Sequence, residues 1–197
     1  MKIKISPAVW IMAAALVLSG DTHTKTVAVI LSAALIHEAG HLIAAAAMNI
    51  PIKCIRIDIF GAYIETRSMS CPYAKEAVLC IAGPLTNIIS AMLSSLVFRF
   101  DTPLFAVSSI ALAVINLLPI NGFDGGRALS CLLLNRFSPR TVSLLTDVTS
   151  FICVFMLWTV SVYFIMRVGA YLSLFVFSSV LFARMFLTGT PSLNNRE

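Results

Sequence analysis

The stretch VAVILSAALIHEAGHLIAAAAM, residues 27–48, decides the class of this chain. It is long enough to cross a bilayer as one helix, because the hydrocarbon core needs about 20 residues. It nevertheless carries His37, Glu38 and His41 near its centre. Ionisable side chains inside a membrane helix are costly, so they are rarely present without a function. The stretch therefore predicts both a membrane helix and a polar site within it.

The composition of the whole chain also indicates a membrane protein. Of its 197 residues, 59% are hydrophobic and only 12% are charged, whereas a soluble domain is about 25% charged. Long uncharged runs between isolated charges predict an all-α polytopic membrane protein with about six transmembrane helices. We expect one membrane-embedded domain over residues 1–187 and a short polar tail over 188–197. The predicted spans are residues 5–20, 27–48, 77–98, 103–119, 148–166 and 168–186.

The net charge of +5 follows membrane topology and not a nucleic-acid-binding patch. With the N terminus in the cytoplasm, only Lys25, Arg99 and Arg167 fall outside, and the other basic residues fall on the cytoplasmic side. This distribution predicts a multi-pass protein that lies in the lipid bilayer, with both termini cytoplasmic and no direct nucleic-acid partner. Residues 1–20 resemble a signal peptide, but no persuasive cleavage site follows, so we expect the first span to be retained.

Two segments between the spans have patterns of their own. Residues 55–59 alternate between isoleucine and charged side chains, and Gly61 follows. This period predicts a small β-hairpin over residues 52–67 on the cytoplasmic side of the membrane, with an irregular loop as the alternative. The second segment opens with INGFDGGR, residues 120–127, and continues as an apolar stretch too short to span. It predicts an interfacial helix that ends near Pro139.

The polar residues of the second predicted span have the spacing of a zinc site. His37 and His41 are four residues apart, so on a helix their imidazoles point the same way and can share one ion. Glu38 is rotated off that face, where it can hydrogen-bond a metal-bound water. In the HExxH arrangement two imidazoles hold zinc and the carboxylate is the general base of a metalloprotease. The alternative is a buried His–Glu pair that joins helices by hydrogen bonds.

One catalytic Zn²⁺ would need a third protein ligand and an open position for water. His23 is too distant, since it lies roughly 20 Å before His37 along a helix, which leaves a carboxylate or a thiolate. Asp124 is the best candidate, because Pro119 breaks the fourth span and the neighbouring glycines permit an unwound segment that turns the carboxylate inward. The other carboxylates are weaker candidates. Three of them belong to the polar cytoplasmic segment, where they are expected in solvent: Asp58, Glu65 and Glu76. Asp101 is on the outer side of the membrane, and Asp147 suits a helix cap.

These residues give the chain a family resemblance. It resembles the site-2-type intramembrane zinc metalloproteases (M50), and within them the stage IV sporulation protein FB-like branch. The matching stretches follow the order of the family: PAVWIMAAALVLSG (7–20), IHEAGH (36–41), IAGPLTN (81–87) and INLLPINGFDGGR (115–127). Members of the branch often carry a cystathionine-β-synthase-type domain after the last span. This sequence has neither that domain nor a PDZ insertion, so we expect no nucleotide sensing or periplasmic tethering of those kinds.

The resemblance implies a site-2 protease core and a function in regulated intramembrane proteolysis. It implies that the substrate is a membrane-associated protein such as a pro-sigma factor of sporulation, cleaved at a site that opens toward the cytoplasm, with a membrane regulatory partner. It also implies substrate-side roles for Asn87 and Asn116; an interhelical hydrogen bond is the alternative for Asn116. The implied catalytic base is Glu38, and the implied zinc ligands are His37, His41 and Asp124.

Two other functional classes compete with a protease. The first is a membrane metal transporter or metal sensor, in which intramembrane histidine and aspartate bind a transient ion. A general base beside the ion and the absence of inverted repeats in the sequence both disfavour it. The second is an inactive scaffold, which the intact set of ligands and base disfavours. Replacing Glu38 by glutamine separates these classes, because only the enzyme depends on the carboxylate.

Overall fold

The computed structural model describes residues 2–5, 21–50, 52–58, 61–66, 72–97, 103–168 and 172–187. Almost all of the predicted first span, and the whole of the predicted tail 188–197, lie outside these residues. The chain divides into two compact units, Met1–Asn116 and Leu117–Glu197, and each is described here by itself.

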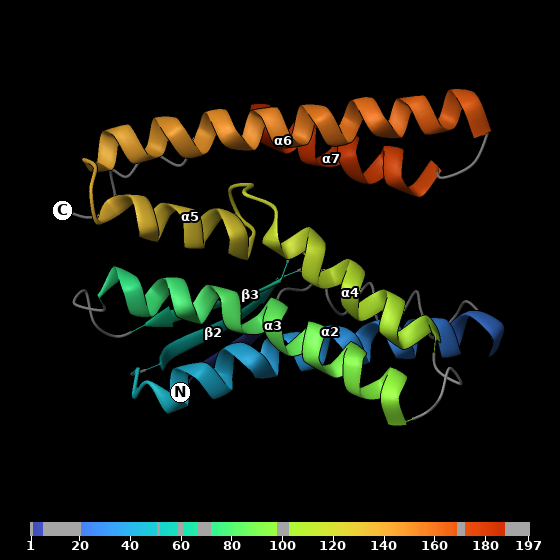
Figure 1. Ribbon diagram of the computed structural model, residues 1–197, viewed down its shortest axis with the longest axis horizontal. Coiled ribbons are helices and arrows are strands. Elements are labelled where there is room, and N and C mark those ends of the chain that lie inside the picture. Colours follow the sequence, from blue (N-terminus) through green and yellow to red (C-terminus); the bar gives the residue numbers. More distant parts are fainter. Residues whose placement is uncertain are drawn as a thin grey trace. The chain divides into compact units, whose positions relative to one another are not determined.

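The first unit combines a small sheet with apolar helices. Its elements in chain order are β1 (Lys2–Ile5), α2 (Asp21–Ala47), β2 (Ile52–Asp58), β3 (Gly61–Thr66), α3 (Tyr73–Val97) and α4 (Pro103–Leu117). The last residue of α4 already belongs to the second unit. Helices α2 and α3 pack along each other (Figure 1), and this packing brings together the residues of the candidate site.

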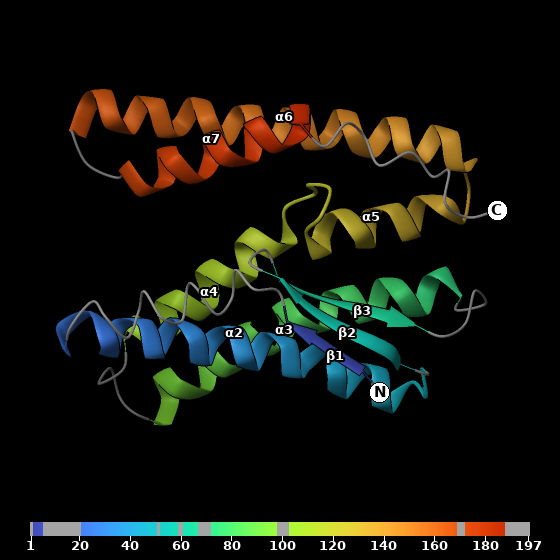
Figure 2. The same ribbon diagram turned by 180° about the vertical axis from the view of Figure 1, so that it is seen from behind.

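The three strands form one sheet in the order β1-β2-β3, and Figure 2 shows them side by side. Strands β2 and β3 are antiparallel, with Ile55 opposite Ile64, and they lie where the sequence predicts a hairpin. The sequence did not predict β1, which pairs in parallel with β2 and places Ile3 opposite Ile55. Parallel neighbours need a long crossover connection, and the segment containing α2 supplies it. The position of this sheet on the cytoplasmic side stays a prediction.

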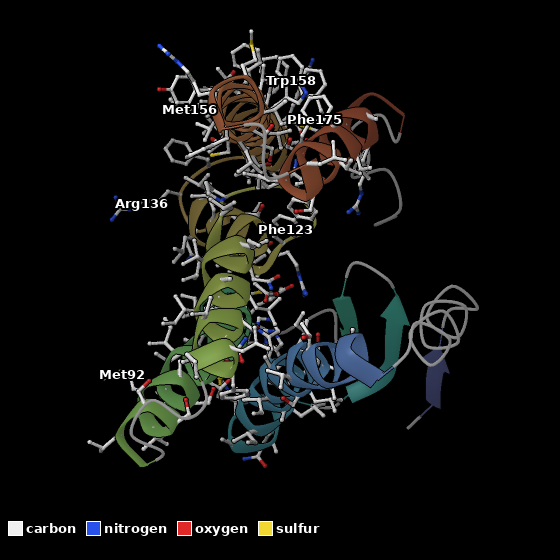
Figure 3. The ribbon with its side chains drawn as sticks, turned by 90° about the vertical axis from the view of Figure 1, so that its right-hand side faces the viewer. Met92, Phe123, Arg136, Met156, Trp158 and Phe175 are labelled. Atoms are coloured by element: carbon white, nitrogen blue, oxygen red, sulfur yellow. The ribbon has the colours of Figure 1, made fainter. Side chains whose placement is uncertain are left out.

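Three helices of the described residues are long and apolar enough to cross a membrane: Thr26–Ala47, Tyr73–Leu96 and Pro139–Arg167. Two shorter apolar helices are Pro103–Leu117 and Leu172–Met185. Their surfaces carry many exposed large apolar side chains; Met92 on α3, for example, points outward (Figure 3). An apolar surface of this extent suits contact with lipid and not with water. The chain is therefore a membrane protein, and the count of six spans stays a prediction.

The second unit contains α5 (Asp124–Leu134), α6 (Pro139–Val168) and α7 (Leu172–Leu187). Helix α6 begins at Pro139, well before the predicted span at 148, because Ser138 and Pro139 form a strong helix start. Ser138 Oγ accepts a hydrogen bond from the backbone N–H of Thr141 at 3.4 Å. The interpretation of Asp147 as a helix cap is therefore wrong, since Asp147 lies inside α6.

Helices α6 and α7 pack along a seam of small polar residues. The hydroxyls of Ser161 and Ser178 are 2.9 Å apart and both residues are fully buried. Trp158 donates a hydrogen bond from Nε1 to Ser179 Oγ at 3.2 Å, and its ring faces Phe175 of α7 (Figure 3). Small side chains let two helices approach closely in a membrane, where apolar burial between helices provides little driving force.

Candidate metal centre

The two histidines of α2 converge as their spacing predicts. His37 and His41 are buried, at 4% and 6% exposure. Their Nε2 atoms lie 3.3 Å apart, and the rings meet edge to face at 80°. Residues four apart on a helix lie one above the other on the same face, so local geometry alone accounts for this convergence. Glu38, the next residue after His37, is half-buried on the same helix.

Helix α3 contacts the histidine pair through three residues spaced four apart. The backbone carbonyl of Leu79 accepts a hydrogen bond from His41 Nδ1 at 2.8 Å. The amide of Asn87 lies 3.3 Å from His37 Nδ1. Between them, a Cβ on Gly83 would come within 2.9 Å of His37 Nε2 and closer still to His41 Nε2. Helix α3 therefore holds the outer nitrogen of each ring, and the glycine at position 83 lets both imidazoles pack closely against its backbone.

The hydrogen bonds also determine which ring nitrogens can bind a metal. Because His41 donates its Nδ1 proton to the Leu79 carbonyl, its lone pair is on Nε2, the nitrogen that lies 3.3 Å from His37 Nε2. His37 would likewise donate its Nδ1 proton if Asn87 Oδ1 faced it. A 180° rotation of the Asn87 amide exchanges Nδ2 for Oδ1 at this position. A metal-binding histidine ordinarily donates its other N–H to a carbonyl or carboxylate in this way. Leu79 and Asn87 are therefore placed to orient the two imidazoles through their Nδ1 atoms.

The separation of the two Nε2 atoms bears on whether the pair can bind one metal ion. Two nitrogens bound to one tetrahedral zinc, at Zn–N distances of about 2.0–2.1 Å, are about 3.3–3.4 Å apart. The observed 3.3 Å has the length of such a tetrahedral edge and is also within reach of a hydrogen bond between the two rings.

Asp124, the predicted third ligand, lies in the second unit. The fourth predicted span ends as expected: α4 stops at Leu117, two residues before Pro119, because the residue that precedes a proline is disfavoured in a helix. The prediction of an unwound segment that carries Asp124 is wrong, because Asp124 is the first residue of α5. The free N–H groups and the dipole at a helix N-terminus favour a carboxylate there.

Two of the glycines after Asp124 explain how tightly the chain reverses. A Cβ on Gly125 would collide with the Leu117 carbonyl, and a Cβ on Gly126 would collide with the Ile120 carbonyl. The backbone that leaves α4 therefore folds directly onto the first turn of α5. This close approach confirms the prediction that the glycines permit a tight backbone path at this point.

The two asparagines implied by the resemblance lie in different surroundings. Asn87 is fully buried against His37, which places it beside the histidine pair. Asn116 is half-buried in the last turn of α4 and donates from Nδ2 to its own helix, at the Leu112 carbonyl, over 3.0 Å. The sequence analysis missed Leu79, which acts through its backbone, and Gly83 as a site residue. Leu79, Gly83 and Asn87 follow one another at intervals of four residues, and this spacing was the available signal.

Comparison with known proteins agrees with this geometry. The model of "Peptidase family M50" matches residues 25–103, a range that contains the histidine pair and the site face of α3. The chain is also 34% identical, over 136 residues, to "Stage IV sporulation protein FB" from Bacillus subtilis (strain 168). Over these residues the chain is similar to members of peptidase family M50. The M50 match ends at the start of α4, so it does not include Asp124.

The extent of these similarities limits what they establish. The alignment with the Bacillus protein covers 66% of this chain and 46% of that relative, so the chain spans less than half of the relative's length. Among solved structures, the chain is similar to "Site-2 Protease from Methanocaldococcus jannaschii", with a TM-score of 0.65 and 17% sequence identity. That similarity covers 92% of this chain and 87% of the other, and it shows a shared fold.

Proposed function

We propose that the chain is an intramembrane zinc metalloprotease, a zinc metalloendopeptidase of the site-2 type. It would hydrolyse a peptide bond in or near the membrane segment of a membrane-associated protein. The observation that carries this proposal is the pair of buried Nε2 atoms 3.3 Å apart, packed closely against Gly83 of α3. The match of residues 25–103 to the model of peptidase family M50 supports the reaction class.

The proposed ligands of the catalytic zinc are His37, His41 and Asp124. Two imidazole nitrogens and one carboxylate oxygen are a usual catalytic donor set, which leaves a fourth position for water. The first two ligands rest on the geometry of α2 and α3. The third rests on chemistry and sequence: Asp124 follows a tightly folded turn, and the stretch INLLPINGFDGGR resembles the corresponding family motif.

Each residue of the site has a role in the proposed hydrolysis. Bound zinc would supply a water that is nucleophilic at neutral pH and would stabilise the charge on the carbonyl oxygen. Glu38 accepts a proton as that water attacks the peptide carbonyl, and it delivers the proton to the leaving amine. The Leu79 carbonyl and Asn87 hold the two imidazoles in position. We propose this orienting role for Asn87 in place of substrate binding, and we keep a substrate-side role for Asn116.

The substrate would bind as an extended peptide. A helical segment hides its carbonyls in hydrogen bonds, so the cleaved part must first lose its helical structure. The inner edge of β2 is already paired with β1, and the outer edge of β3 is available for pairing among the described strands. A peptide could add to that edge as a further strand. In the proposed topology both termini and the site opening face the cytoplasm, and a pro-sigma factor is the expected kind of substrate.

The experiment that tests the proposal replaces Glu38 by glutamine. The full chain is co-expressed with candidate membrane-tethered transcription factors, and cleavage is read as a size shift. We expect Glu38→Gln to bind about one zinc per chain and to abolish the shift, because the amide cannot accept the proton. Glu76→Gln, at the start of α3, is the matched control and should cleave normally. An undiminished size shift with Glu38→Gln would overturn the protease proposal.

A further inference from the structure

The turn before α5 is fixed onto α6 by one residue, Asn121. Its side-chain Nδ2 donates a hydrogen bond to Asp147 Oδ1 at 2.6 Å. Its backbone N–H donates to Ser150 Oγ at 2.8 Å. Asp147 and Ser150 are three residues apart and so lie on the same face of α6. Asn121 is therefore held through both its side chain and its backbone. We call this set of three residues the Asn121 clamp.

Other contacts close the turn around the same point. Phe123 donates its backbone N–H to the Ile120 carbonyl at 3.0 Å, and both side chains are buried. On the α7 side, the guanidinium of Arg184 lies so near Gly122 that an added Cβ would be 3.2 Å from Nη2. Asp124 follows within one residue of this closed turn. A displacement of Asn121 would therefore be passed on directly to Asp124.

We propose that Asp147 is a positioning residue for Asp124 and acts through Asn121. This inference rests on the proposed function, which assigns Asp124 as a zinc ligand. By holding Asn121, Asp147 fixes the path of residues 118–123 and thereby the place where α5 begins. Catalytic geometry is sensitive to such a constraint, since a misplacement of about 1 Å can cost about 100-fold in rate.

The chemistry of the clamp favours positioning over simple helix packing. A carboxylate in an apolar helix is costly and rarely present without a function. Helices α6 and α7 pack along neutral serines, so packing in this unit does not need an ionisable residue. An Asp–Asn hydrogen bond adds what an apolar contact lacks, namely one preferred distance and direction. That property matters for a turn that leads into a metal ligand.

The test exchanges the two partners of the side-chain bond in the full-length purified chain. Asn121→Asp places two carboxylates against each other and should separate the turn from α6. The double variant Asn121→Asp/Asp147→Asn restores one acid, one amide and the bond between them. Asp147→Ala removes the acceptor for Asn121 Nδ2 and should weaken metal binding as Asn121→Asp does. Ser161→Ala is the matched control, because it removes a buried polar contact of α6 that does not touch the turn.

The readout is Co²⁺ titrated into the metal-free protein in detergent, followed by its visible absorption spectrum. We expect Asn121→Asp to weaken Co²⁺ binding about tenfold and to change the spectrum, because indirect supports of a metal site typically contribute about 10–100-fold in affinity. The double variant should regain the wild-type affinity and spectrum. If the contact only stabilised the fold, Asn121→Asp would lower the unfolding temperature but leave the Co²⁺ spectrum unchanged, so the double variant would have no spectrum to restore.

Three outcomes would overturn the inference: unchanged Co²⁺ binding in Asn121→Asp, failure of the double variant to recover, or an equal loss in Ser161→Ala. Asp124→Ala separates this inference from the proposed function. If Asp124→Ala retains full Co²⁺ binding, Asp124 is not a ligand and both ideas fail. If Asp124→Ala loses binding while the clamp variants keep it, only the positioning role of Asp147 fails.

Discussion

Replacing Gly83 by alanine would place a methyl group against the Nε2 atoms of His37 and His41. The new Cβ would lie 2.9 Å from His37 Nε2 and nearer still to His41 Nε2. Non-bonded heavy atoms pack at about 3.5 Å or more, so the His37 ring would have to move by roughly 0.6 Å and the His41 ring by more. The Leu79 carbonyl at 2.8 Å from His41 Nδ1 opposes such a movement.

The expected effect on metal binding is large because coordination tolerates little displacement. Metal–ligand distances stay within about 0.2 Å of their usual values, and the required shift is roughly three times that. We therefore expect Gly83→Ala to bind zinc about 100-fold more weakly or worse, with loss of cleavage. Overpacking of the helix pair should also cost about 1–3 kcal/mol in the free energy of unfolding.

The assay is the zinc content of the purified protein together with Co²⁺ affinity. Gly40→Ala is the matched control, since it adds the same methyl group to the same helix pair away from the imidazoles. Its Cβ would meet the Thr86 side chain and come within 2.9 Å of the Ala82 carbonyl. It should lower stability but keep zinc. Stoichiometric zinc and normal cleavage in Gly83→Ala would refute the assignment of the two Nε2 atoms to a metal ion.

Three further predictions follow from other contacts. Asn87→Ala should weaken zinc binding about 10–100-fold because His37 loses the side chain that lies 3.3 Å from its Nδ1, whereas Asn87→Asp, which offers an oxygen acceptor to Nδ1, should keep binding; equal losses in a zinc titration would contradict this. Gly122→Ala should destabilise the chain by about 1–3 kcal/mol, since Gly122 has φ +99° and lies against Arg184, and thermal unfolding in detergent measures it. Deleting the hairpin Ile52–Thr66 should keep zinc content but impair cleavage; full activity would reject strand addition.

The features that the sequence predicted well are those that local geometry determines. The convergence of His37 and His41 follows from the helical period over a single turn, and the structure confirms it. The end of α4 before Pro119 follows from the backbone restriction that proline imposes on its neighbours. The hairpin strands lie at the alternating residues because that alternation has the period of a strand. None of these predictions required knowledge of a distant segment.

The features that the sequence did not predict depend on distant segments or on the backbone. The pairing of Ile3 with Ile55 depends on a crossover that no local pattern encodes. Asp147 was interpreted as a cap because its partner, Asn121, belongs to another element. The start of α5 at Asp124 was missed because glycines, which usually weaken helices, are needed here for close packing against Ile120 and Leu117.

The contact between His41 and the main chain at Leu79 has a consequence for mutational studies. Any L-amino acid at position 79 would offer the same carbonyl, so an alanine scan would leave that hydrogen bond in place. The scan would record only the packing lost where the Leu79 side chain meets Ala45 and Ile50. Of the three α3 residues that contact the histidine pair, Leu79 would therefore not be recognised as a site residue by side-chain substitution. A backbone amide-to-ester substitution, which weakens the carbonyl acceptor, would reveal it.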